Sequence, residues 1–264
     1  MLKKGRIGAL ALASAAAATL VASQLGPASA APALNPGVAP GGNFNLSVWE
    51  LQLPTGSSGS VTTIPPAQLK GANGFHDQYF FTNTTDGSMS FWDPENGVHT
   101  TNSKFPRSEL REMTSSGAAA DWAIPGTHKL SATLKVTQVP SSVCVGQIHL
   151  GSGGSTKPLL ELFYAPNGNI TMAIEQTPAG GNEVRHPAGN VPLGTQWSYV
   201  IGLTGGNTIS LVINGGATQK WALPSSFTSK YHMYFKAGDY DQTAGSSSTV
   251  GAKVQFYALS IAHS

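Results

Sequence analysis

The sequence predicts an all-β protein, a β-sandwich or jelly roll with one curved sheet face open to solvent. Most of the chain consists of short runs in which apolar and polar residues alternate, the pattern of half-buried strands. Turn-forming residues separate these runs, and the 31 glycines suit tight connections between many strands. After the N-terminal segment, the one helical signal is a single turn over residues 65–71, entered by proline and left by glycine.

The first 30 residues have the pattern of a secretory signal peptide. A basic head precedes an apolar, alanine-rich run, and Ala28-Ser29-Ala30 provides the small residues of a cleavage site. We therefore expect cleavage after Ala30 and a secreted, extracellular protein. Residues 31–43 are rich in proline and glycine and are expected to form a flexible N-terminal arm.

Residues 44–264 are long enough for one large domain, and no repeat or change of composition marks a second one. Cleavage removes three of the 15 basic residues and leaves 12 against 13 acidic residues, a formal charge of −1. This small negative charge gives no support to a nucleic-acid partner, and we expect none. After residue 30 no apolar run is long enough to span a membrane, so we expect no membrane span. We also expect a monomer. Cys144 is the single cysteine, so no disulfide forms within the chain, and we expect a buried thiol facing away from Gln147.

The predicted strands follow one another with short connections. Asp86-Gly87, Asn167-Gly168 and Asn214-Gly215 are turn pairs that favour hairpins. Residues 115–128 and 177–195 lack periodicity and are expected to be loops that act as lids. The alternating runs cover residues 46–54, 79–82, 89–92, 129–139, 159–164, 170–174, 197–203, 209–213, 231–236 and 253–261.

Three short polar stretches are expected to form one functional face. They span residues 107–112, 147–149 and 234–242. Because alternate side chains of a strand point to the same side, each stretch presents several polar groups together. Guanidinium, ammonium, amide, imidazole and phenol groups in one place suit an anionic, hydroxyl-rich partner. The face is expected to carry Arg107, Glu109, Arg111, Gln147, His149, Lys236, Tyr240 and Gln242.

These stretches resemble the conserved blocks of the alginate lyases of polysaccharide lyase family 7. Arg107-Ser-Glu-Leu-Arg111, Gln147-Ile-His149 and Tyr234-Phe-Lys-Ala-Gly-Asp-Tyr-Asp-Gln242 are similar to its first, second and third blocks, in the family's order. The resemblance extends to Trp49-Glu-Leu-Gln-Leu-Pro54 and Phe91-Trp-Asp-Pro-Glu-Asn-Gly97 and covers nearly all of the chain after residue 43. It implies a jelly-roll β-sandwich with a substrate cleft on its concave sheet, which cleaves alginate, an anionic polysaccharide, by β-elimination without a metal or other cofactor.

The residues suit the chemistry that the resemblance implies. Removing the C5 proton of a 1,4-linked uronate builds negative charge beside its carboxylate, and Arg107 and Gln147 are expected to stabilise that charge. His149, with an ordinary pKa of about 6.5, is the expected base, and Tyr240 the expected donor to the departing oxygen. The products carry a C4–C5 double bond at the new non-reducing end.

The remaining polar groups are expected to bind substrate. Arg111, Lys236 and Gln242 receive this role, and Glu109 is expected to orient the neighbouring arginines. By the resemblance, Ile148 in the second block favours guluronate-containing substrate, and we expect cleavage within the chain rather than from its end.

Three other functions fit parts of the pattern. The same chemistry serves a lyase of another polyuronate, such as glucuronan. A non-catalytic polysaccharide-binding lectin is compatible with the basic face, although it has no use for His149 and Tyr240. A glycoside hydrolase needs two suitably spaced carboxylates in its cleft, and the sequence shows no such cluster.

Overall fold

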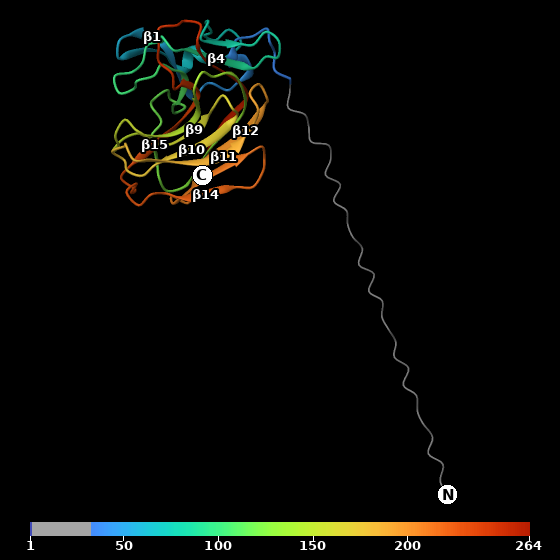
Figure 1. Cartoon of the computed structure of the whole chain (residues 1–264), viewed down its shortest axis with the longest axis vertical. Coiled ribbons are helices and arrows are strands. Elements are labelled where there is room, and N and C mark those ends of the chain that lie inside the picture. Colours follow the sequence, from blue (N-terminus) through green and yellow to red (C-terminus); the bar gives the residue numbers. More distant parts are fainter. Residues whose placement is uncertain (2–32) are drawn as a thin grey trace. The chain divides into compact units, whose positions relative to one another are not determined.

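Two antiparallel β-sheets pack against each other in the computed structural model, which describes Met1 and residues 33–264 (Figure 1). Apart from Met1, the expected signal peptide over residues 1–30 lies outside the described residues. Nearly all regular structure from residue 33 onward is strand, and the protein is a β-sandwich of the jelly-roll type. No helix among the described residues is long and apolar enough to span a bilayer.

The first sheet holds nine strands within residues 33–264, in the order β11-β10-β9-β8-β15-β5-β1-β2, with β6 paired to β15. Strands distant in sequence are neighbours here, because β15 lies between β5 and β8. The three predicted polar stretches are therefore brought onto adjacent strands. The strands are β1 (Trp49–Ser57), β2 (Ser60–Ile64), β5 (Ser108–Glu112), β6 (Trp122–Ala123), β8 (Val143–Leu150), β9 (Pro158–Tyr164), β10 (Asn169–Glu175), β11 (Glu183–Asn190) and β15 (His232–Asp241).

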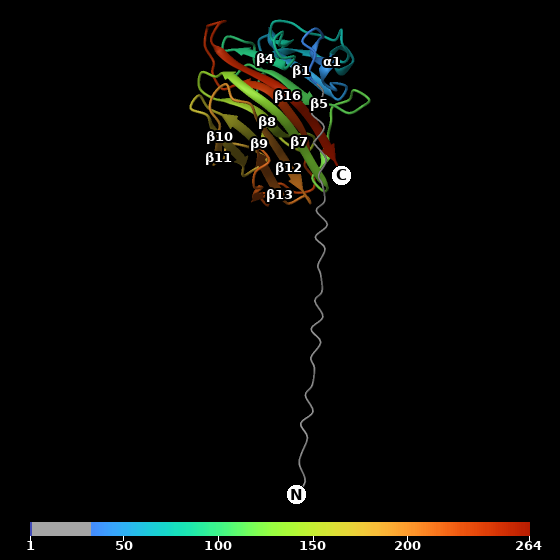
Figure 2. The same cartoon turned by 90° about the vertical axis from the view of Figure 1, so that its right-hand side faces the viewer.

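The second sheet holds seven strands in the same part of the chain, in the order β14-β13-β12-β7-β16-β4-β3 (Figure 2). The hairpin of β13 and β14 turns after β13 at Asn214-Gly215, and both residues of that pair have positive φ (51° and 65°), as the pair predicts. The strands are β3 (Phe80–Thr82), β4 (Met89–Pro94), β7 (Thr127–Gln138), β12 (Trp197–Thr204), β13 (Thr208–Ile213), β14 (Gln219–Ala222) and β16 (Gly251–His263).

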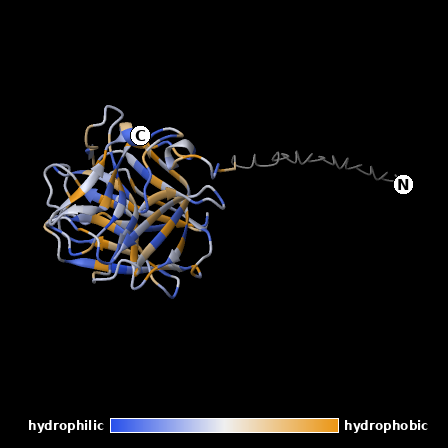
Figure 3. Cartoon of the chain, turned by 90° about the horizontal axis from the view of Figure 1, so that it is seen from above, coloured by the Kyte–Doolittle hydropathy of each residue, from blue (hydrophilic) through white to orange (hydrophobic). Residues whose placement is uncertain are grey.

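The core lies between the two sheets, because each sheet turns its apolar side chains inward. Hydrophobic and hydrophilic residues alternate along the strands (Figure 3). The inward set includes Trp197, Tyr199, Ile148 and Phe235, all at most 2% exposed. The Tyr199 hydroxyl also donates to the Val145 carbonyl at 2.7 Å, which ties β12 of one sheet to β8 of the other. The second sheet thus covers the core-facing side of the first sheet. The opposite face of the first sheet remains accessible to a ligand.

The described part of the expected arm is packed rather than flexible. Residues 40–43 form the short helix α1 (Pro40–Asn43), Leu34 packs on the core and Ala39 is 7% exposed. The Ala39 N–H donates to the carbonyl of Ala72, and the Asn43 amide donates to that of Gly87 at 3.1 Å. These contacts fix residues 33–43 against the domain despite their proline and glycine content. The helical turn predicted over 65–71 is α2 (Pro66–Leu69).

Candidate active site

A cleft of about 910 Å³ lies on the outer face of the nine-stranded sheet. Side chains from seven adjacent strands line it, from β1 at one side to β11 at the other. Seven of the eight predicted site residues are part of its lining. They are Arg107, Arg111, Gln147, His149, Lys236, Tyr240 and Gln242.

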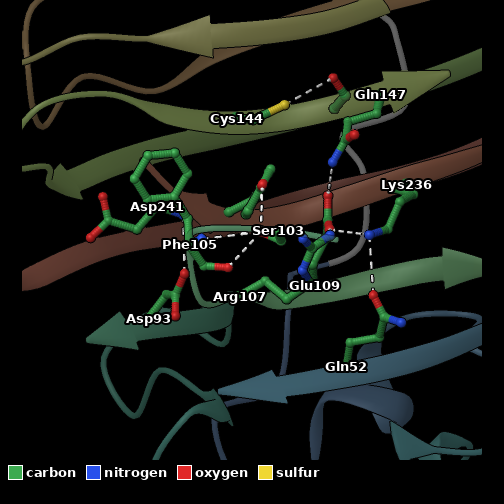
Figure 4. A network of polar contacts seen from close by, with 12 residues as sticks. Gln52, Asp93, Ser103, Phe105, Arg107, Glu109, Cys144, Gln147, Lys236 and Asp241 are labelled. Atoms are coloured by element: carbon green, nitrogen blue, oxygen red, sulfur yellow. Dashed lines mark hydrogen bonds and ion pairs between the residues drawn. The ribbon is translucent and has the colours of Figure 1, made fainter. Parts of the chain in front are cut away.

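The eighth, Glu109, lies beneath the cleft and connects its polar groups (Figure 4). Its side chain is 0% exposed and accepts from three donors, which lie on β8, on β15 and directly before β5. Gln147 Nε2 lies 2.5 Å from Oε1, while Arg107 Nη1 and Lys236 Nζ lie 3.2 and 2.5 Å from Oε2. Glu109 therefore orients one arginine, as predicted, but its other partners are Gln147 and Lys236 rather than Arg111. The register explains this, because β15 and β8 lie on the side of β5 where these residues face Glu109.

Lys236 is 3% exposed and depends on this carboxylate for its charge. Burial and the nearby Arg107 lower the pKa of Lys236 to about 8, although Glu109 opposes the shift. Lys236 also donates to Gln52 Oε1 at 3.1 Å. Sequence reasoning missed Gln52, because its role depends on the pairing of β1 with β5.

His149 is set up to act as a base through one ring nitrogen. Nδ1 lies 3.0 Å from the Leu150 carbonyl, which can only accept, so Nδ1 carries the hydrogen and Nε2 keeps its lone pair. Burial, with the positive charges of Lys236, Arg107 and Arg111, lowers the pKa of His149 to about 3. The imidazole of the free enzyme is therefore neutral at far lower pH than the ordinary value near 6.5 suggests. Its ring also stacks on Tyr234, at 5.1 Å and 24°.

Tyr240 is held from three sides. The Arg107 guanidinium lies 4.1 Å from its ring centroid, Phe105 packs edge-on at 6.4 Å, and Ser103 Oγ lies 2.9 Å from its hydroxyl. Because Ser103 donates its own hydrogen to the Phe105 carbonyl, the Tyr240 hydroxyl is the donor to Ser103. Burial raises the pKa of Tyr240, with Arg107 and Ser103 opposing, so the phenol keeps its proton. Ser103 lies in a loop without a pattern and was missed from the sequence.

Arg111 and Gln242 also line the cleft. The Arg111 guanidinium lies 4.0 Å from the centroid of Tyr234, and its Nη1 donates to the Glu112 carbonyl at 3.1 Å. Gln242 donates its side-chain amide to the Tyr240 carbonyl at 3.1 Å. In both residues a hydrogen bond to a backbone carbonyl of the sheet fixes the position of the side chain in the cleft.

Two details of the strands depend on how neighbouring strands pair, and the first corrects a prediction. Cys144 is buried as expected, but a β-bulge between Cys144 and Gly146 places it on the cleft side, where it packs against Tyr240. Gly238 (φ +146°) is required by the next strand rather than by substrate, since a Cβ there would lie 2.8 Å from the Ser108 carbonyl oxygen. Tyr240 lines the cleft together with Lys236, as alternation predicts, although the pairing of β15 with β8 shifts register between Ala237 and Tyr240.

The two expected lid loops are partly strands. The second, residues 177–195, contains the eight-residue strand β11, which pairs with β10 and borders the cleft. The first, residues 115–128, contains β6 and the start of β7. Strand β11 has a mostly exposed sequence with proline and glycine in it, as suits an edge strand, so it lacks the alternation that marks the others.

Comparisons with known proteins agree on one family. A family model described as alginate lyase matches residues 44–263. An alginate lyase of Klebsiella pneumoniae is 26% identical over 284 residues, which cover 85% of this chain and 91% of the relative.

Solved structures extend this agreement to the fold. The family 7 alginate lyase A1-II′, in a variant bound to product, superposes with a TM-score of 0.76 at 36% identity, covering 86% of this chain and 100% of its own. An alginate lyase from Pseudomonas aeruginosa gives 0.75 at 32% identity, covering 83% and 99%. Together with the cleft that unites the three polar stretches, these matches show that the chain belongs to the alginate lyases of polysaccharide lyase family 7.

Proposed function

We propose that this alginate lyase is a secreted enzyme that cleaves within guluronate-containing chains by β-elimination, with His149 as base and Tyr240 as acid. The observation that carries the proposal is the arrangement of these two side chains around a cationic centre. His149 pairs in register with Tyr234 on β15, six residues before Tyr240. Base and acid therefore flank Gln147 and Lys236 from opposite sides along the strands.

The centre between them suits the substrate carboxylate. Glu109 uses one N–H of the Gln147 amide, and the second N–H of that Nε2 remains for the substrate. Arg107 and Lys236 supply positive charge from buried positions. With little water nearby, a hydrogen bond from such a group to the developing enolate-like charge is strong. Neutral Nε2 of His149 takes the C5 proton, the electron pair forms the C4–C5 double bond, and the C4–O bond breaks as Tyr240 protonates the departing oxygen.

Placing base and acid on opposite sides supports guluronate as the preferred sugar, since its C5 hydrogen and leaving oxygen call for two separate groups. In mannuronate, Tyr240 alone can serve both roles. The length of the cleft supports internal cleavage, because seven strands at a spacing of about 4.8 Å give it a width of roughly 30 Å, enough for several sugar units.

Purified protein lacking residues 1–30 should be mixed separately with polyguluronate, polymannuronate and glucuronan while ultraviolet absorbance of the unsaturated product is followed. We expect the fastest rise with polyguluronate, no rise with any polymer in Tyr240→Phe, and no rise with polyguluronate in His149→Ala, which should keep activity on polymannuronate if Tyr240 alone serves there. Viscosity should fall well before absorbance levels off if cleavage is internal. A flat trace with all three polymers despite retained binding would identify a lectin, and a rise with glucuronan alone would reassign the substrate.

Secretion needs a separate measurement. The full chain should be expressed in a secreting bacterial host and the N-terminus of the protein in the medium sequenced. We expect it to begin at Ala31, whereas retention of the uncleaved chain in the cell would contradict export.

A further inference from the structure

Glu161 extends the row of polar side chains that crosses the cleft. It pairs in register with Gln147, from the next strand of the sheet, and it lines the same cleft. Its neighbours Leu160 and Leu162 turn into the core, which directs the Glu161 carboxyl outward. Adjacent strands lie about 4.8 Å apart, close to the length of one sugar unit, so Glu161 faces the unit next to the one at Gln147.

Glu161 differs from the other carboxyl groups at this cleft in having no partner. Glu109 accepts from two cations and an amide, and Glu175 accepts from four backbone N–H groups. Glu183 lies 2.6 Å from Arg185 Nε. Within residues 33–264, Glu161 makes no hydrogen bond or ion pair that would hold it as an anion.

The surroundings of Glu161 disfavour its negative charge. Burial is the main cause, and Glu183 and Glu109 add to it, while Arg185 and Arg107 oppose it, so that the pKa of Glu161 rises to about 8. On β8 the facing groups are the neutral Gln147 and the buried thiol of Cys144, and on β10 the directly paired residue is Ala173. The other charged groups of the cleft are Lys157, Glu175, Lys236 and Arg111.

We propose that Glu161 binds the uronate next to the one held by Gln147, through a carboxyl group that carries its proton when the polysaccharide is bound. A neutral carboxyl group donates a hydrogen bond to a uronate carboxylate or hydroxyl. Its ionised form repels a polyanion, and Arg185, which is already paired with Glu183, does not offset that repulsion. Glu161 thus makes binding of the polymer depend on pH without taking part in the elimination.

Kinetics against pH test this role, which rests on the proposed function. With a pKa of about 8, the binding-competent fraction of wild-type enzyme falls between pH 7 and pH 9, so KM should rise about tenfold. Glu161→Gln cannot ionise at this position and keeps an amide donor, so its KM should rise less than that of the wild type over that range, and the remaining rise comes from Lys236, whose pKa is also about 8. Glu183→Gln removes a neighbouring negative charge that helps to raise the pKa of Glu161, so it should keep the rise in KM but move it to lower pH. An equal rise in Glu161→Gln would overturn the proposal.

A binding measurement separates this inference from the elimination mechanism. Saturated oligoguluronate should be titrated calorimetrically into Tyr240→Phe at pH 8.5 in two buffers of different ionisation enthalpy. Binding should take up protons, and adding Glu161→Gln should remove most of that uptake, while any remainder comes from groups such as Lys236. Unchanged uptake would refute the role of Glu161 whether or not the protein is catalytically active.

Discussion

Replacing Glu109 with glutamine should damage both the stability and the catalysis of this lyase. The substitution keeps the shape of the side chain but removes its charge and replaces one acceptor with an N–H donor. Since both carboxylate oxygens already accept, one of the donors Gln147, Arg107 and Lys236 must then face another donor.

The expected cost follows from the burial of these groups. Removing one partner of a buried ion pair costs about 3–5 kcal/mol, and for a domain of this length 1 kcal/mol lowers the melting temperature by roughly 2–4 °C. We therefore expect a fall of roughly 10 °C at neutral pH. The kcat should fall about 100-fold, because a shift of about 1 Å in the side chains that Glu109 positions has an effect of this size.

The pH dependence of the stability loss gives a sharper test. Lys236 has its folded-state pKa lowered to about 8, below that of the unfolded chain, and losing Glu109 lowers it further. The unfolding free energy that Glu109→Gln loses because of Lys236 is therefore lost in full at low pH, where Lys236 is charged. This contribution disappears as the pH rises through about 8, whereas the contribution due to Arg107 persists.

Thermal unfolding monitored by near-ultraviolet circular dichroism from pH 6 to pH 9, with ultraviolet assay of the same samples, would measure both effects. Glu183→Gln is the control, because its partner Arg185 is 54% exposed and such pairs contribute at most about 1 kcal/mol. If Glu109→Gln melted within 2 °C of the wild type and kept its kcat within about twofold, the described role of Glu109 would be wrong.

Three further predictions concern single residues. For His149, whose pKa is lowered to about 3 chiefly by burial, kcat/KM should stay flat from pH 7 down to pH 5; a tenfold fall per unit below pH 6.5 would show an ordinary imidazole. Ser103→Ala removes the acceptor of the Tyr240 hydroxyl and should lower kcat about fivefold with little change in KM, whereas a loss as complete as in Tyr240→Phe would make Ser103 a participant in proton transfer. Gly238→Ala adds a Cβ 2.8 Å from a carbonyl oxygen of β5 at φ +146°, so denaturant unfolding should show a loss of about 1–3 kcal/mol; an unchanged midpoint would mean that the strands separate freely.

The sequence sufficed for the fold and for most of the cleft because strand periodicity is a local property. Arg107, Gln147, His149 and Lys236 could each be assigned to a face from alternation within their own strand. The β-bulge between Cys144 and Gly146 shifts that alternation and moves Cys144 to the face opposite the predicted one. A bulge depends on the fit of neighbouring strands, so no pattern within a single strand reveals it.

The partners that tune these groups could not be predicted in the same way. Gln52 and Ser103 reach the cleft from a distant strand and from a loop, and only the pairing of strands brings them there. The pKa of His149 depends on burial and on three cations from two other strands, so the ordinary value was a poor guide. Glu161 lies on a strand that was predicted, but its lack of a partner is visible only in three dimensions.

The contacts of Glu109 also bear on how the chain finds its fold. Its carboxyl joins side chains of β5, β15 and β8, three central strands that are far apart in sequence. A slip of one residue in any of these pairings would turn Gln147 or Lys236 to the opposite face of the sheet and leave buried charges unpaired. Misregistered sheets are therefore penalised by the same groups that bind substrate. Selection for activity in this protein is at the same time selection for correct strand pairing, and a refolded molecule that cleaves its polymer has its central strands aligned.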